Sequence, residues 1–355
     1  MNDSIVQKAA SQFGAGEPRI EPFGNGLINQ TYKISFTDGT TLLLQCINPA
    51  TFSQPENIIH NYQLITHELL SKGNNTVPPL VTTRKGKYFW IDETENFWRA
   101  TGFIENSYAD SIPASAAKVY LAAKCFATFS ASLFQLNPDK FEVIIPQFHD
   151  LSYRYEQFET AVKAAGINRL LKATHVISSL RERHSLVGYY QSVVNNPEDY
   201  PVRIMHHDCK ISNILFDKLT NHVICPVDLD TVMPGRFYSD IGDMVRTMAC
   251  SREENSTEWE NIDIVPDYYH AIIDGYIDGS GNTLTRTEKA HLHYAGQMLI
   301  YMQCLRFVTD FLNNDIYYKT IYPEQNLNRA LNQLILLEKL ETFLEELGTS
   351  KSIAG

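Results

Sequence analysis

One short segment of the chain, HHDCKISNILFD, combines residue types that phosphoryl transfer requires at close spacing. Asp208 is followed by Lys210 and Asn213, and a further carboxylate, Asp228, comes fifteen residues after Asn213. Phosphoryl transfer needs a carboxylate to accept the hydroxyl proton, oxygen ligands for Mg²⁺ and positive charge near the γ-phosphate. A short loop would hold Asp208 close to Asn213, and a following hairpin could return Asp228 to the same point.

A second candidate is the glycine pair Gly24-x-Gly26, which lies between two segments of β-forming residues. Glycine lets backbone N–H groups approach a phosphate, because no Cβ stands in the way. A G-x-G sequence is more often only a tight turn. Its position directly before a strand hairpin favours a phosphate-binding loop.

The first hundred residues read as a small sheet with one helix. Asp38-Gly39 is a hairpin signal, and apolar residues at helical spacing predict a helix that begins at Pro55 and stops at Gly73. The runs that predict strands are TYKISFT, TLLLQCI, LVTTR, KYFWID and FWRATGFIE.

From about Pro113 onward the pattern is mostly helical, interrupted by two β-like runs, VRIMHHD and HVICPVDLD. This order predicts an α+β protein with a small β-rich N-terminal lobe and a larger helical C-terminal lobe. We assign residues 1–104 to a nucleotide-binding lobe and residues 105–355 to a catalytic and substrate-binding lobe.

Composition argues against several other classes of protein. The 355 residues are 44% hydrophobic and 20% charged, as in a globular protein with a sizeable core, and the net charge of −11 argues against general nucleic-acid binding. The six cysteines form no CxxC pair, and no apolar run is long enough to span a bilayer. We therefore expect a cytoplasmic protein with no membrane or nucleic-acid partner.

The loop and the later aspartate together resemble the catalytic loop and metal-binding aspartate of the protein-kinase-like superfamily. The resemblance implies ATP and Mg²⁺, with Asp208 as the catalytic base and Lys210 meeting the γ-phosphate. It makes Asn213 and Asp228 the metal ligands. Asp230, two residues further on, is a candidate second carboxylate ligand.

The segment from Gly24 to Tyr32, GNGLINQTY, is similar to the glycine loop of N-acetylhexosamine 1-kinases, in the aminoglycoside phosphotransferase and choline kinase branch. VDLDTVMPG, DIGD and LRFVTDFLNNDIYYK agree, so the resemblance runs from Gly24 to about Arg329. It implies a hinge that reads adenine mostly through backbone atoms. The residues expected to bind the nucleotide are Gly24, Asn25, Gly26, Asn29, Lys33, Phe103, Ile104 and Glu105.

The same resemblance implies a sugar acceptor, N-acetylglucosamine or N-acetylgalactosamine, phosphorylated on its anomeric hydroxyl. Charged side chains bind sugar hydroxyls through paired hydrogen bonds. Arg306 and Asp310 stand four apart on one predicted helix, so an ion pair without a ligand role is the alternative for Arg306. The residues expected to bind the sugar are Asp208, Asp243, Arg246, Arg306 and Tyr317.

One position departs from the protein-kinase pattern, because the strand lysine would fall near Gln45, which is neutral. Lys33 could supply the cation or could be only a solvated strand lysine, and Glu68 is a candidate helix carboxylate or a surface charge. Two other functions stay open. The protein could be a kinase of another alcohol, such as choline, homoserine or an aminoglycoside, or a nucleotide-binding pseudokinase, which only Gln45 supports.

Overall fold

A computed structural model of the chain describes residues 3–24, 28–73 and 77–348. The chain forms two compact units. The first consists of Met1–Tyr108, Gln135–Pro146 and Leu215–Pro234, and the second of Ala109–Phe134, Gln147–Ile214 and Gly235–Gly355. The predicted division of roles at residues 104 and 105 stays a prediction.

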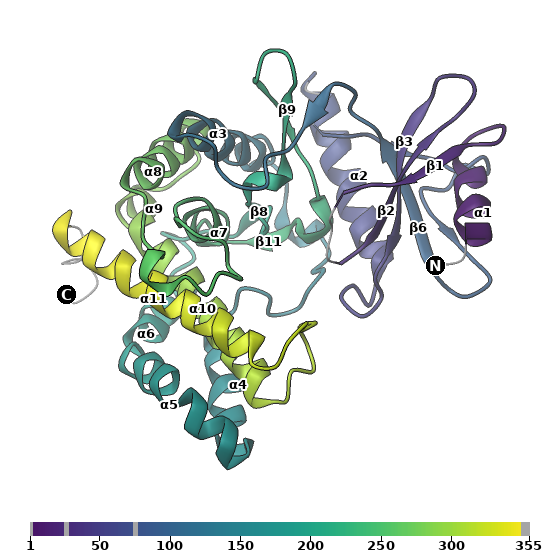
Figure 1. Cartoon of the computed structure of the whole chain (residues 1–355). Coiled ribbons are helices and arrows are strands. Elements are labelled where there is room, and N and C mark those ends of the chain that lie inside the picture. The colour runs from purple at the N-terminus through teal and green to yellow at the C-terminus, as the bar shows by residue number, and fades with distance from the viewer. Residues whose placement is uncertain (1–2, 25–27, 74–76, 349–355) are drawn as a thin grey trace. The chain divides into compact units, whose positions relative to one another are not determined.

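The first unit is built on an antiparallel sheet in the order β1-β2-β3-β6-β4, with β5 also pairing with β6 (Figure 1). The β2–β3 hairpin turns at Asp38-Gly39, as predicted, and Gly39 has a φ of 89° that glycine adopts without strain. The strands are β1 (Arg19–Pro22), β2 (Gln30–Ser35), β3 (Thr41–Ile47), β4 (Leu80–Val81), β5 (Trp90–Ile91) and β6 (Phe97–Gly102).

Helix α1 (Asp3–Phe13), which the sequence analysis does not predict, packs on one face of this sheet. Its buried residues Val6 and Phe13 join a core that includes Leu42 and Leu44 of β3. Successive side chains of a strand point to opposite faces, so Gln45 lies on the face turned away from α1. That face is therefore the one that can carry polar residues.

Helix α2 (Pro55–Ser71) confirms the predicted helix, with proline in its first turn and Gly73 at a φ of 68° just beyond its end. Its buried Asn61 explains why later segments belong to the first unit. The Asn61 amide donates to the carbonyl oxygens of Glu142 and Val232, each at 2.9 Å, and accepts from the Glu142 N–H at 2.9 Å. One side chain thus bonds to both returning segments.

The returning segments form short elements. These are η1 (Pro138–Lys140), β9 (Ile214–Asp217), β10 (Val223–Pro226), η3 (Leu229–Thr231) and β11 (Met233–Gly235), while β7 (Ser107–Tyr108) ends the first stretch of the unit. Strands β9 and β10 are neighbours in a sheet with β7. Asp217 accepts from the backbone N–H groups of Leu219 and Thr220 and so fixes the turn between β9 and β10. This is the hairpin predicted between Asn213 and Asp228.

The second unit is mainly helical. Helix α10 is buried on nearly every side and packs against α4, α7 and α11 (Figure 1). Gly242 of α7 has no room for a Cβ beside the Ala295 carbonyl of α10, so glycine permits this close packing. The elements are α3 (Ala116–Ser132), α4 (Leu151–Ala164), α5 (Ile167–Glu182), α6 (Ser185–Val194), β8 (Arg203–Met205), η2 (Ile211–Asn213), α7 (Tyr238–Met248), η4 (Trp259–Asn261), α8 (Pro266–Ser280), α9 (Arg286–Ala290), α10 (Leu292–Leu312) and α11 (Gln325–Glu346).

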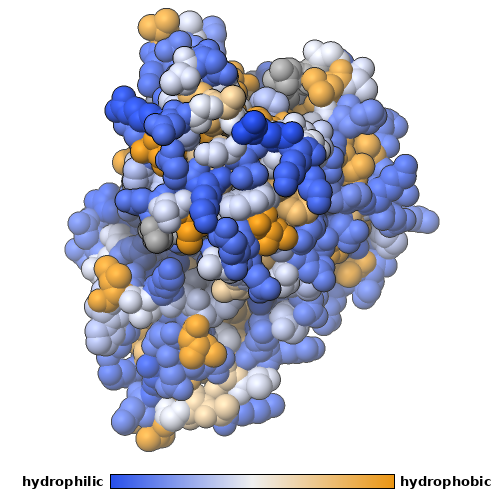
Figure 2. Space-filling view, turned by 90° about the vertical axis from the view of Figure 1, so that its right-hand side faces the viewer, coloured by the Kyte–Doolittle hydropathy of each residue, from blue (hydrophilic) through white to orange (hydrophobic). Residues whose placement is uncertain are grey.

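An antiparallel sheet in the first unit and helices in the second confirm the predicted α+β class. No helix within residues 3–24, 28–73 and 77–348 combines the length and apolar character needed to cross a membrane. The face drawn in Figure 2 is mostly hydrophilic with scattered apolar residues, as expected of a surface in contact with water.

Candidate active site

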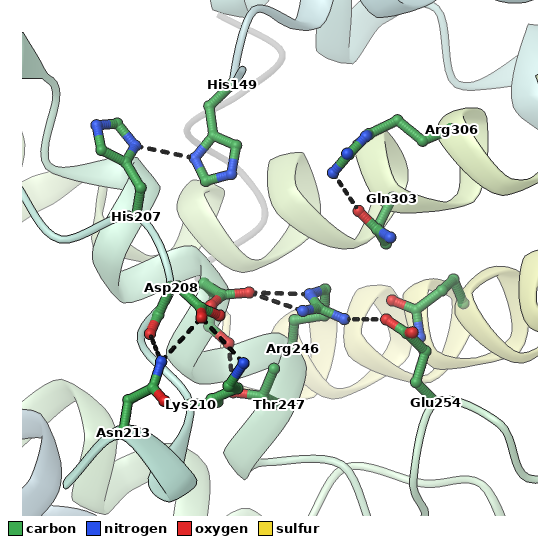
Figure 3. Close-up of polar contacts among 12 residues, drawn as sticks. His149, His207, Asp208, Lys210, Asn213, Arg246, Thr247, Glu254, Gln303 and Arg306 are labelled. Carbon is green, nitrogen blue, oxygen red and sulfur yellow. Dashed lines mark hydrogen bonds and ion pairs between the residues drawn. The ribbon is translucent and has the colours of Figure 1, made fainter. Parts of the chain in front are cut away.

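Asp208 lies in the loop between β8 and η2 of the second unit. The Asn213 amide donates to the Asp208 carboxylate at 2.8 Å and to the Asp208 backbone carbonyl at 2.9 Å. The Lys210 ammonium lies 2.9 Å from the same carboxylate oxygen (Figure 3). The structure therefore brings together the three polar residues of the loop that the sequence singled out.

These contacts set the charge of Asp208. Burial acts to raise the pKa of Asp208, but the neighbouring Lys210 ammonium and the Asn213 hydrogen bond hold that pKa below its ordinary value. The side chain keeps 27% of its surface exposed, so a hydroxyl can reach it. Asp208 is thus an ionised and accessible carboxylate, which is what a proton acceptor must be.

Asp240 of α7 holds the backbone of this loop. This role of Asp240 was not predicted from the sequence. Its two carboxylate oxygens accept from the backbone N–H groups of His206 and His207 at 3.1 and 2.8 Å. Burial raises the pKa of Asp240 to about 6. His206 is fully buried, and its ring packs edge-on against Phe126, so it supports the loop from the interior.

Asp243 and Arg246 of α7 lie in the same unit as Asp208. Arg246 donates to Asp243 at 3.0 and 2.9 Å and to Glu254 at 2.6 Å, so two carboxylates match its charge. Burial raises the pKa of Asp243, Arg246 opposes the shift, and the negative charge of Asp208 adds to it. Asp208 and Asp243 are therefore close enough to influence each other's ionisation.

Other polar side chains lie near Asp208 and Arg246. Figure 3 shows His149, Gln303 and Arg306 on the opposite side of a common space. The ring nitrogens of His149 and His207 approach to 3.3 Å. Burial and the positive charges around it, including that of Arg306, hold the pKa of His149 well below its usual value, so the ring is neutral. Sequence reasoning missed His149, because no motif marks it.

Arg306 donates to Gln303 at 2.9 Å, and among the described residues no ion pair joins it to Asp310. Asp310 instead accepts from the backbone N–H groups of Tyr317 and Tyr318, at 2.8 and 3.0 Å. The ion pair considered from the four-residue spacing is not formed, because the carboxylate is used to fix the loop after α10. Tyr317 is 64% exposed.

The predicted nucleotide-binding residues that the structure describes lie in the first unit. Gly24 has a φ of 73°, whereas Asn25 and Gly26 lie outside the described residues. The Lys33 ammonium lies 4.1 Å from the centre of the Phe103 ring and 3.9 Å from a Glu105 carboxylate oxygen. The Phe103 to Glu105 hinge and Lys33 are therefore brought together.

Ile104 and Glu68, two other residues considered for the nucleotide site, each have a polar partner within the first unit. The Ile104 carbonyl accepts from the Ser107 hydroxyl at 2.6 Å. Glu68 pairs with Lys72 of its own helix at 2.7 Å, which agrees with its reading as a charge on the helix surface.

The carboxylates predicted to bind metal follow β10 in the first unit. Asp228 adopts a left-handed backbone with φ 62° and ψ 59°, a conformation that costs energy in residues other than glycine and gathers at functional sites. Asp230 is almost fully buried; it accepts from the Asn29 amide at 2.7 Å and pairs with Arg99. Among the described residues, no group of three or more His, Cys, Asp or Glu side chains could hold a metal ion.

Most of the chain matches the model of a known protein family. The model of a phosphotransferase enzyme family, APH, matches residues 19–283. The chain belongs to the phosphotransferase enzyme family. The matched region includes Asp208, Asn213, Asp228 and Arg246 and ends before α10. The predicted placement in the aminoglycoside phosphotransferase branch is confirmed at this level, and the N-acetylhexosamine subfamily stays a prediction.

Solved structures of phosphotransferases share the fold over nearly the whole chain. A microcompartment-associated aminopropanol kinase matches with a TM-score of 0.67 and 16% identity, covering 98% of this chain and 99% of that one. A choline/ethanolamine kinase family protein from Mesorhizobium loti matches at 0.59 and 13%, covering 99% and 97%. Amicoumacin kinase, in complex with AMP-PNP, Ca²⁺ and Ami, matches at 0.61 and 12%, covering 94% and 93%. The predicted kinase-like fold is thereby confirmed.

Proposed function

We propose that this phosphotransferase moves the γ-phosphate of ATP to the anomeric hydroxyl of an N-acetylhexosamine. The observation that carries the proposal is the state of Asp208, which Lys210 and Asn213 keep ionised and oriented. A binding module without catalysis has no need of an exposed carboxylate held in this way. The pseudokinase alternative is correspondingly disfavoured.

In the proposed reaction Asp208 accepts the proton of the sugar hydroxyl. The hydroxyl oxygen forms a bond to the γ-phosphorus, the bond from that phosphorus to the β–γ bridging oxygen breaks, and ADP leaves with the electron pair. Lys210 is expected to turn from Asp208 toward the γ-phosphate when nucleotide is bound. Its ammonium would then balance the negative charge of the transferring group.

The chemistry of the available donors fits Mg²⁺. Asn213 uses its amide nitrogen on Asp208, so its amide oxygen is the atom it can offer to a cation. Mg²⁺ prefers a few hard oxygen ligands and keeps several waters, so a small number of protein oxygens can hold it. We propose Asn213 and Asp228 as ligands, with Asp230 as a candidate. The bound ion would neutralise charge on the β- and γ-phosphates.

The charges near Asp208 favour an acceptor without an ammonium group. Arg306 and Arg154 are hydrogen-bonded to glutamine side chains, and within the described part of the chain neither forms an ion pair with a carboxylate. Arg246 and Arg329 both pair with Glu254. The carboxylates here are thus already matched by arginines, and a cationic acceptor would meet added positive charge.

The aromatic rings lead to the same conclusion. A cation can bind over a ring face, as in an aromatic cage. Here the Arg306 guanidinium lies 5.4 Å from the Phe148 ring centre and 5.6 Å from that of Tyr318, and Arg329 lies 4.9 Å from Tyr318. The rings that could form a cage for choline already contact arginines. A carbonyl such as the acetamido oxygen of an N-acetylhexosamine would be a suitable acceptor for the Arg306 donors.

The test is ADP release from Mg-ATP with a panel of acceptors: N-acetylglucosamine, N-acetylgalactosamine, the unacetylated aminohexoses, choline, ethanolamine, homoserine and an aminoglycoside. We expect turnover with the acetylated sugars. The unacetylated aminohexoses are the matched control, because they carry an ammonium group in place of the neutral acetamido group. Faster turnover of choline or ethanolamine than of the acetylated sugars would reject the proposed acceptor.

A further inference from the structure

A row of three polar side chains crosses the sheet of the first unit on the face turned away from α1. The β-ladder places Thr31 of β2 opposite Gln45 of β3, and Gln45 opposite Arg99 of β6. Directly opposed residues of antiparallel strands project on the same side of the sheet. The Gln45 amide donates to the Thr31 hydroxyl at 3.3 Å, and its oxygen accepts from Arg99 at 3.1 and 2.8 Å.

From this row Arg99 reaches Asp230, with which it forms an ion pair. The two side chains are only 3% and 2% exposed. Burying two charges costs much of what their attraction supplies unless further hydrogen bonds support them. Here Gln45 accepts from Arg99, and Asn29 donates to the other Asp230 oxygen at 2.7 Å. The cluster is therefore built to hold the position of Asp230.

Asn29 links the cluster to a further part of the chain. Its side-chain oxygen accepts from the Asn48 N–H at 3.0 Å, so one amide joins the residues after β3 to the carboxylate after β10. Asp228 directly precedes the short helix η3, and Asp230 lies within it. Fixing Asp230 consequently limits where Asp228 can lie.

This arrangement accounts for the neutral residue at position 45. A glutamine offers Arg99 an acceptor, whereas a lysine at this point of β3 would place a second cation opposite the arginine. Lys33 does not take part, because its ammonium lies beside Phe103 and Glu105. Glu68 is paired with Lys72.

We infer that Arg99 is the positioning cation of the nucleotide-binding unit: oriented by Gln45, it fixes Asp230 and with it the segment that carries Asp228. Arg99 is buried and acts through Asp230, so it is a positioning residue and not a ligand of the nucleotide. The inference rests on the proposed function only in assigning nucleotide and metal to this unit.

The experiment exchanges the cation between the two strands. It measures binding of a non-hydrolysable ATP analogue with and without Mg²⁺, in wild type, Gln45→Lys, Arg99→Met and the double variant. We expect each single variant to lose about tenfold or more of the Mg²⁺-dependent enhancement, as supporting contacts of metal ligands typically do. The double variant should regain part of it, because the introduced lysine then has Asp230 to itself.

Arg183→Met is the matched control. Arg183 makes a two-point ion pair with Glu341, and both residues belong to the helical unit, whereas Asp230 belongs to the first unit. Thermal unfolding of every variant identifies loss of fold. The inference is overturned if Gln45→Lys binds Mg-nucleotide as tightly as wild type, if Arg99→Met binds unchanged, or if the double variant is no better than the worse single one.

The assay contains no acceptor. If the wild type binds Mg-nucleotide but turns over none of the sugars, the acceptor proposal fails while the comparison among variants stands. If the wild type shows no Mg²⁺-dependent binding, the inference and the proposed function both fail.

Discussion

Asp240 accepts a 2.8 Å hydrogen bond from the backbone N–H of His207, the residue directly before Asp208. His207 adopts a left-handed φ of 66°, and the second Asp240 oxygen binds the N–H of His206. The shape of the loop that carries Asp208 thus depends on a carboxylate that is fully buried in α7. Burial disfavours the ionised form of this carboxylate, whereas the two backbone hydrogen bonds stabilise that form.

The first prediction concerns the pH dependence of stability through Asp240. Because burial raises the pKa of Asp240 to about 6 in the folded protein, above the ordinary aspartate value of about 3.9, the stability it contributes is present at low pH and lost as pH rises through 6. We expect the difference in unfolding free energy between wild type and Asp240→Asn to be larger at pH 4 than at pH 7, by about 2 kcal/mol.

Urea unfolding at several pH values measures this difference. Asp217→Asn is a control, because hydrogen bonds from the turn lower the pKa of that partly exposed carboxylate, and its contribution should change in the opposite direction with pH. A pH-independent difference for Asp240→Asn would show that Asp240 is not protonated in this range.

The second prediction concerns the proposed base. Asp208→Asn keeps the size of the side chain but removes the charge and the basic oxygen, so we expect turnover to fall by about 10²- to 10⁴-fold. Nucleotide binding and the melting temperature should change little. ADP release under saturating acceptor measures the effect, and a variant with near-normal turnover would exclude Asp208 as the base.

The third prediction concerns the metal. Asp228→Ala removes a hard oxygen ligand at the residue proposed as the principal one. We expect ATP-analogue binding to lose its enhancement by Mg²⁺ while the weaker metal-free binding persists. Titration with and without Mg²⁺ tests this, with Asp217→Ala as a carboxylate control on the preceding hairpin. An enhancement equal to that of wild type would refute the role.

The fourth prediction concerns Arg306. Arg306→Gln retains a polar side chain but shortens it and removes the charge. Loss of a charged hydrogen bond to the acceptor should raise KM for N-acetylglucosamine by about tenfold or more, with little change in KM for ATP. Arg169→Gln, in a separate ion pair with Asp315, is the comparison variant. Equal effects of the two substitutions would point to a purely structural role.

The fifth prediction is that the product is a sugar 1-phosphate. Residues of the second unit, including Asp243 and Arg306, would hold the ring hydroxyls and acetamido group and leave C1 facing Asp208. The anomeric hydroxyl is also more acidic than a primary alcohol, which eases proton transfer. Phosphorus NMR decides the position: an anomeric phosphate couples to H1 and is acid-labile. Coupling to two C6 protons would instead indicate the primary alcohol.

Local patterns carried most of the successful sequence predictions. The β2–β3 hairpin follows from Asp38-Gly39, and α2 follows from apolar periodicity between Pro55 and Gly73. The contacts of Asp208 with Lys210 and Asn213 were also predictable, because these residues are at most five apart in one loop.

Contacts between distant residues were not predictable in the same way. Arg99 and Asp230 are 131 positions apart, and their meeting depends on strand register and on the return of the chain after β10. Arg306 and Asp310 illustrate the same limit. Their four-residue spacing left an ion pair open as the alternative to a ligand role, but the backbone N–H groups of the following loop bind the carboxylate. Spacing alone does not reveal such competitors.

The Asn61 amide has a consequence for how the protein is made. Its partners, Glu142 and Val232, lie 81 and 171 residues further along the chain. During synthesis the N-terminal hundred residues leave the ribosome before either partner has emerged, and a buried amide without partners is unfavourable. The first unit can therefore complete its fold only after residue 232 has emerged, by which time the ribosome has already released Asp208 and its loop.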